Sequence, residues 1–153
     1  AEIATGRDLL GRIAAEIEDV RRRHPDAIPR EPLALLALDL HSYYTKLEAL
    51  IERILLSFEG HFPRDEAEHA GLVRISYLAI PGIRPAIFNE PVRDALDELR
   101  RFRDFFRHAY SLDLRADKLE CVLVPFLSAH RIIDGDLGAF VQFIEMMVAE
   151  LES

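Results

Sequence analysis

The chain has 153 residues and a formal net charge of −8 at pH 7. This length suits one domain over residues 1–153, large enough to bury a core without disulfides or metals. The acidic balance excludes broad, non-specific nucleic-acid binding, which needs an excess of Lys and Arg, but it allows a local basic patch. No apolar run approaches the roughly 20 residues of a membrane-spanning helix, and the first residues lack the layout of a secretory signal. We therefore expect a soluble, cytoplasmic protein.

Hydrophobic residues recur at helical spacing along most of the chain. The first stripe predicts a helix over residues 6–24. A proline-bearing connection over residues 25–32 then leads into a long second helix that ends near residue 59. Residues 66–79 are compatible with a shorter third helix. The prolines and glycine of residues 80–85 must end it, because proline lacks the amide donor and clashes with the preceding turn.

A fourth helix follows this loop and reaches residue 109. Asn89 is a candidate N-cap for it, and Pro91 is tolerated in its first turn. Two further apolar stripes predict helices over residues 119–127 and 137–151.

Pro125 is a candidate kink in the first of these two stripes, and the lone cysteine, Cys121, is expected to be buried because apolar residues follow it. Few segments alternate with the period of two that a half-buried strand shows. The sequence therefore predicts an all-α fold, an antiparallel bundle of about five to six helices.

Positive charge is concentrated in residues 100–110, in the second half of the fourth helix. On a regular helix Arg103, Arg107 and Tyr110 fall within roughly 60° of one another, at the edge of the apolar arc. His108 lies about 140° round from Arg103, on a polar face shared with Arg101. These side chains are suited to an anion if a concave surface exists. The alternative is that Arg100 or Arg103 forms surface ion pairs, with Asp104 and Asp97 respectively, of little energetic value.

Other chemical signals are weaker. Tyr44 and Glu48, near the middle of the second helix, are candidate cleft residues, and their plainer interpretation is packing plus a solvent-facing carboxylate. The remaining histidines, including His130, are scattered without the spacing of a zinc helix. Residues 134–136 resemble the start of a calcium loop but lack its later ligands. We expect no metal and no cofactor.

The segment from Arg103 to Tyr110 has the form Arg, four residues, His, one residue, Tyr. At the end of an amphipathic helix in a small all-α chain, this motif resembles the HEPN superfamily, specifically the HepT-like toxins paired with minimal nucleotidyltransferase antitoxins. Residues 40–52 and 80–85 add to the resemblance, which covers most of residues 33–115. The motif alone is short, and its position, helix order and flanking segments supply the rest of the match.

This resemblance implies a homodimeric toxin of a bacterial toxin-antitoxin system, acting as a metal-independent endoribonuclease, with tRNA as the suggested substrate. Arg103 and His108 of both subunits would form a composite catalytic site, and Arg100, Arg101 and Arg107 would bind RNA phosphates. Tyr110 would accept AMP groups from the cognate nucleotidyltransferase antitoxin, which would switch the toxin off.

Two other interpretations stay open. The chain could be a non-catalytic HEPN helical module that binds a nucleotidyltransferase or its substrate, although such a module has no chemical reason to keep the motif complete. It could also be a helical scaffold without a nucleic-acid role, in which case Arg103 and His108 would lie far from any groove.

Overall fold

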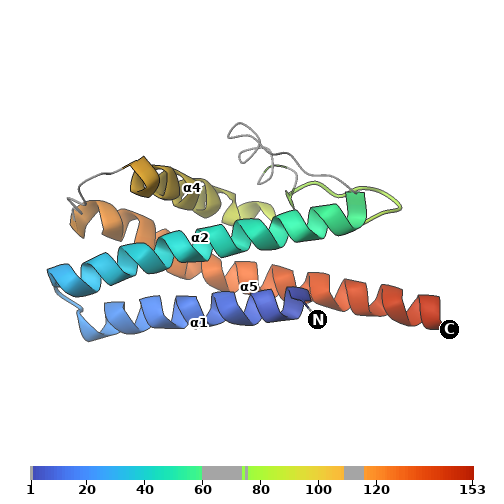
Figure 1. Cartoon of the computed structure of the whole chain (residues 1–153), viewed down its shortest axis with the longest axis horizontal. Coiled ribbons are helices and arrows are strands. Elements are labelled where there is room, and N and C mark those ends of the chain that lie inside the picture. Colours follow the sequence, from blue (N-terminus) through green and yellow to red (C-terminus); the bar gives the residue numbers. More distant parts are fainter. Residues whose placement is uncertain (1, 60–73, 75, 109–115) are drawn as a thin grey trace.

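The computed structural model describes residues 2–59, 74, 76–108 and 116–153, and this part of the chain is predominantly helical. Its elements in chain order are α1 (Glu2–Arg23), α2 (Arg30–Glu59), the 3₁₀ helix η1 (Glu90–Val92), α4 (Arg93–His108) and α5 (Ala116–Glu152). Helix α1 packs against α2 and α5, and α4 packs against α2 and α5. Successive helices run in opposite directions, and the C-terminal end of α5 extends past the N-terminus of α1 (Figure 1). The described residues thus form an antiparallel bundle.

One apolar core lies between these helices, as the helical stripes of the sequence predicted. The largest fully buried side chains include Leu10 and Ile17 of α1, Leu36 and Ile54 of α2, and Phe126 of α5. Each repeats with its buried neighbours at steps of three and four residues, so each helix turns one apolar face inward. Polar residues at the edges of these apolar faces therefore lie beside the core.

The C-terminal part of the chain differs from the prediction, because one helix replaces two. The predicted helices over residues 119–127 and 137–151 are parts of the continuous α5, which contains Pro125. The ring of Pro125 removes a single backbone hydrogen bond. Buried residues on both sides of it, among them Leu123 and Phe126, keep the helix packed. Tertiary packing therefore outweighs the local break.

Helix α5 also corrects the expectation for Cys121. Its side chain is exposed, not buried. The buried stripe of α5 runs through Leu119, Val122 and Leu123, and residue 121 falls between these positions on the outer side. The apolar residues that follow Cys121 were therefore a poor guide to its burial.

The helix boundaries show smaller differences. Helix α1 begins at Glu2 and α2 at Arg30, both earlier than predicted, and Pro32 lies in the first turn of α2, where its missing amide proton breaks no helical bond. Residues 66–73 and 75 of the predicted third helix lie outside the described residues; residues 74 and 76 are helical, but residues 77–79 are not, so the helix does not reach residue 79.

The loop before α4 is a tight turn held by backbone hydrogen bonds. Gly82 has φ of 78°, which glycine adopts readily, and Ile80 and Arg84 form an isolated antiparallel bridge around it. The buried Arg84 donates from Nη1 to the carbonyl of Leu78 at 2.8 Å. This turn, predicted from its prolines and glycine, directs the chain into η1 and α4.

Asn89 was predicted to cap the next helix, but its side chain makes no capping hydrogen bond. Its Nδ2 donates instead to Asp136 Oδ1 of α5 at 2.7 Å, and its backbone N–H donates to the other oxygen of Asp136 at 2.9 Å. Asn89 therefore ties the start of η1 to α5.

Candidate functional site

Arg103 is a buried charged residue on the inner edge of α4. Only 8% of the residue is exposed, because it follows the buried residues Leu96, Leu99 and Phe102 on the face that packs against the bundle. The sequence placed Arg103 at the edge of this apolar arc, and its near-complete burial goes beyond that expectation. A buried guanidinium needs compensating partners, since removing a charge from water is unfavourable.

Two carboxylates compensate Arg103. Its Nη2 lies 3.8 Å from Oε1 of Glu48 on α2, and both of these side chains are only 10% exposed. Its Nη1 lies 3.3 Å from Oδ1 of Asp104, the next residue of α4. Arg100 completes the group, because its Nη1 lies 3.8 Å from Oδ2 of Asp104. The charges of Arg100 and Arg103 are therefore balanced by those of Glu48 and Asp104.

The phenol of Tyr44 borders the same group. Tyr44 is fully buried, and its position four residues before Glu48 puts both side chains on one face of α2. Burial raises the pKa of Tyr44, the negative charge of Glu48 raises it further, and Arg100 and Arg103 partly oppose this shift. A contact between the hydroxyl and the Glu48 carboxylate also raises this pKa, although it falls short of a hydrogen bond of regular geometry. We call Tyr44, Glu48, Arg100, Arg103 and Asp104 the Tyr44 cluster.

The structure thus brings together several side chains that the sequence singled out separately. Arg100 and Arg103 of α4 meet Tyr44 and Glu48 of α2. The interpretation of Glu48 as a solvent-facing carboxylate is wrong, since the residue is 8% exposed. Its partner comes from another helix, and intrahelical spacing could not reveal that contact.

The other predicted site residues do not join this cluster. Arg101 is exposed and pairs with Glu98 on the outer face of α4, at 2.6 Å. The backbone of Arg107 and His108 belongs to the last turn of α4, but their side chains lie outside the described part of the chain. Tyr110 also lies outside the described residues.

A second polar cluster, which the sequence did not indicate, joins α1, α2 and α5. The hydroxyl of Tyr43 and Nδ1 of His130 are 2.8 Å apart. Arg7 donates from Nε and Nη2 to the two oxygens of Asp134 at 2.8 and 3.1 Å. The Arg7 guanidinium lies against Gly138, where an added Cβ would come within 3.0 Å of it. Tyr43, His130, Arg7 and Asp134 form what we call the Tyr43 cluster.

The electrostatics of the Tyr43 cluster favour a neutral imidazole. Burial lowers the pKa of His130, and the negative charges of Asp134 and Glu18 oppose this shift. The hydrogen bond from Arg7 lowers the pKa of Asp134. Asp134 and Asp136, which resembled a calcium loop in the sequence, hold Arg7 and Asn89 respectively. These contacts explain both carboxylates as structural links between elements.

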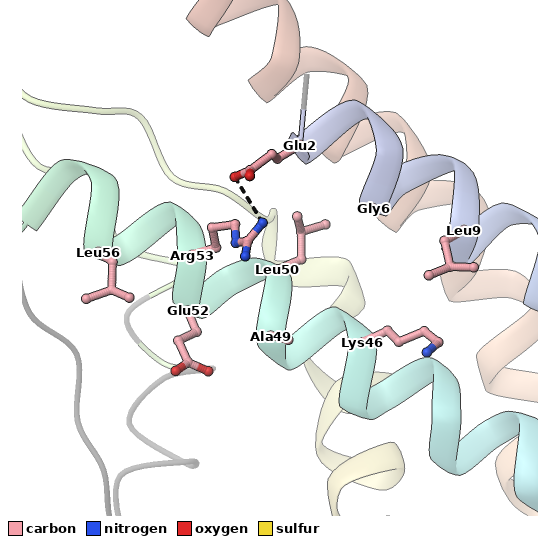
Figure 2. A pocket seen from close by; sticks show the side chains of 9 residues that line it. All are labelled: Glu2, Gly6, Leu9, Lys46, Ala49, Leu50, Glu52, Arg53 and Leu56. Carbon is pink, nitrogen blue, oxygen red and sulfur yellow. Dashed lines mark ion pairs between the residues drawn. The ribbon is translucent and has the colours of Figure 1, made fainter.

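A surface groove with a volume of about 420 Å³ lies elsewhere, between α1 and α2. Figure 2 shows Lys46 and Arg53 of α2 on one side of it and Gly6 and Leu9 of α1 on the other. Arg53 spans the groove to Glu2 at 2.9 Å. Lys46 and Arg53 project from the side of α2 away from Glu48, by the 100° helical step. This groove is therefore separate from the Tyr44 cluster.

The described part of the chain shows neither a metal-binding cluster nor a membrane-spanning helix. Among the side chains that the structure describes, histidine, cysteine and acidic residues do not gather in threes that could hold a metal ion. Among the helices described there, none combines the length and apolarity needed to cross a bilayer.

Comparison with known proteins places this geometry in a family context. A family model described as HepT-like protein matches residues 35–144. The match begins near the start of α2, includes both helices that supply the Tyr44 cluster, and ends within α5. No curated protein and no solved structure matches the chain.

Proposed function

The chain belongs to the HepT-like family of HEPN proteins, and from this membership we propose that it is the toxin of a toxin-antitoxin pair. Its activity in this proposal is metal-independent endonucleolytic cleavage of RNA in the cytoplasm, with tRNA as the substrate class. The supporting observation is that the motif arginine, Arg103, lies beside Tyr44 and Glu48 at the contact of α2 with α4.

The proposed reaction needs a base, an acid and positive charge at the phosphate. His108 removes the proton of a ribose 2′-hydroxyl, whose oxygen then forms a bond to the adjacent phosphorus. The bond from phosphorus to the 5′ oxygen breaks, and that oxygen takes up a proton. Arg103 stabilises the negative charge on the phosphoryl oxygens. The products are a 2′,3′-cyclic phosphate and a free 5′-hydroxyl, and His108 suits both proton transfers because imidazole titrates near neutral pH.

A homodimer would add a second copy of the motif and more positive charge to the site. In a single chain the charge of Arg103 is balanced by Glu48 and Asp104. The 100° step of a regular helix would put Arg103 and His108 about 140° apart, so a two-fold partner brings such groups round one phosphate more readily than one chain does. In the proposed dimer Arg100, Arg101 and Arg107 of both chains add phosphate-binding charge.

The proposed off-switch is Tyr110, two residues after His108. A cognate nucleotidyltransferase antitoxin would transfer AMP to the hydroxyl of Tyr110. Each adenylate adds negative charge and bulk near Arg103 and Arg107, which opposes binding of RNA phosphates.

The substitution His108→Ala tests the catalytic assignment. We expect RNA cleavage by purified protein to fall by about 10²–10⁴-fold, because a proton-transfer group is lost. The helical fold and the oligomeric state should stay unchanged. The matched control is His24→Ala, in the connection between α1 and α2, which should cleave at the wild-type rate. Undiminished cleavage by the His108 variant would contradict the assignment.

A second candidate function is a non-catalytic HEPN module that binds a nucleotidyltransferase or its substrate. The charge balance around Arg103 favours it, since a compensated guanidinium attracts phosphate less than a free one. The same assay separates the two functions, because a binding module cleaves no RNA even as wild type.

A further inference from the structure

The contact between Arg103 and Glu48 differs from the other ion pairs of α4. Arg100 with Asp104 and Arg101 with Glu98 are intrahelical pairs with at least one exposed partner. Glu48 instead reaches Arg103 from another helix, and both side chains are 10% exposed. A buried carboxylate is unfavourable unless it is paired, so its place at this contact calls for a specific role.

We propose that Glu48 is a positioning residue that fixes the Arg103 guanidinium for phosphate contact in the RNA-cleavage reaction, an inference that rests on the proposed function. Glu48 does not touch the substrate. It acts by holding the guanidinium at the contact of α2 with α4.

The contact leaves donors on Arg103 available. A guanidinium has five N–H donors in a planar fork. Glu48 lies near Nη2 and Asp104 near Nη1. Within the described part of the chain these are the carboxylates that meet Arg103, and in the proposed arrangement a phosphate oxygen accepts from the N–H groups that do not point at them. Glu48 can therefore orient the guanidinium and stay in place during the reaction.

Tyr44 determines where the Glu48 carboxylate can lie. The buried phenol of Tyr44 is one turn before Glu48 on the same face of α2, and Glu48 is close enough to raise its pKa, so the two side chains are neighbours. Asp104 lacks this confinement, since 47% of its side chain is exposed. Of the two carboxylates that meet Arg103, Glu48 is the one in a fixed, buried position.

The test is Glu48→Gln, which removes the negative charge and keeps the shape. We expect kcat for RNA cleavage to fall by about 10–100-fold, because a misplaced catalytic group lowers the rate to this extent. KM, and the Kd of a non-cleavable RNA with 2′-deoxy substitution at the cleaved position, should change less than about threefold. Glu48→Asp, which keeps the charge, should retain more activity than Glu48→Gln.

Two matched variants isolate positioning from general damage. Glu31→Gln changes the same residue type at an exposed position in the first turn of α2, more than four turns before Glu48, and should leave kcat unchanged. In an Arg103→Ala background, Glu48→Gln should lower kcat no further, since there is no guanidinium left to position.

The outcomes are distinguishable. If Arg103→Ala is inactive but Glu48→Gln keeps the wild-type kcat, the positioning role is wrong and the proposed function stands. A kcat above wild type in Glu48→Gln would also overturn it, because the carboxylate would then compete with phosphate for Arg103. If the wild-type protein cleaves no RNA, the proposed function and this inference both fail.

Discussion

Adjacent tyrosines of α2, Tyr43 and Tyr44, lie in two polar clusters of opposite character. A step of about 100° along the helix turns Tyr43 toward α5 and Tyr44 toward α4. The Tyr43 hydroxyl pairs with His130 at 2.8 Å, and its ring packs edge-on against Phe126 at 4.6 Å. The Tyr44 hydroxyl has only a looser contact with Glu48, short of a hydrogen bond of regular geometry, and Nε of Arg100 has no hydrogen-bond partner among the described residues.

Two groups of buried polar side chains in one core are thus paired to different degrees. Polar groups that serve only the fold are normally hydrogen-bonded when buried, as in the Tyr43 cluster. The Tyr44 cluster has longer charge contacts, between 3.3 and 3.8 Å, and it contains the motif residue Arg103. Incompletely paired polar groups beside a candidate catalytic residue are consistent with a site whose remaining donors are meant for a ligand.

The largest expected effect comes from breaking the charge pair of the Tyr44 cluster. Arg103→Met alone and Glu48→Leu alone should each lower the free energy of unfolding by about 3 kcal/mol, because each removes the buried partner of a buried charge. The double variant should lie within about 1 kcal/mol of wild type, since an apolar pair replaces the ion pair. Denaturant unfolding measures this, with an unchanged slope as the check on two-state behaviour.

The Tyr43 cluster supplies the control for that cycle. Arg7→Met removes a hydrogen-bonded charge whose pair is 36% and 41% exposed, so we expect a loss of only about 1 kcal/mol. If the double variant at Arg103 and Glu48 were as unstable as the sum of its single variants, the two side chains would not be coupled, and the buried charge pair of the Tyr44 cluster would be absent in solution.

We expect the free energy of unfolding to depend on pH through His130 of the Tyr43 cluster. Burial lowers the pKa of His130, so the folded chain takes up this proton at lower pH than the unfolded chain, whose histidine titrates near the usual 6.5. The contribution of neutral His130 is complete above pH 6.5 and is lost as pH falls through the lowered pKa. Asp134, whose pKa is also lowered, loses its contribution only in a separate window below its usual 3.8.

Unfolding followed from pH 7.5 downward measures this dependence against a His130→Gln variant. The variant should show a smaller decrease in the free energy of unfolding below pH 6.5, because its side chain does not titrate. An equal decrease in both proteins would mean that other groups cause it.

The sequence predicted the parts of this fold that depend on local periodicity. The inward faces of α1, α2 and α4 follow from apolar spacing, and the turn before α4 follows from its prolines and Gly82. The continuity of α5 was missed because packing on both sides of Pro125 overrides a local signal. Contacts between helices carry no local signature, so neither the burial of Glu48 nor the bond from Tyr43 to His130, 87 residues apart, could be predicted.

The smallest expected effect separates the two tyrosines directly. Tyr43→Phe leaves Nδ1 of His130 without its partner, and should lower the free energy of unfolding by about 1–2 kcal/mol. Tyr44→Phe removes a buried hydroxyl without a regular hydrogen bond, so it should change that energy by less than about 0.5 kcal/mol. The two variants delete the same atom at adjacent buried positions, so each controls for the other in denaturant unfolding. Equal losses would show that the Tyr44 hydroxyl is as well bonded as that of Tyr43, and the incomplete pairing that distinguishes its cluster would then be absent in solution.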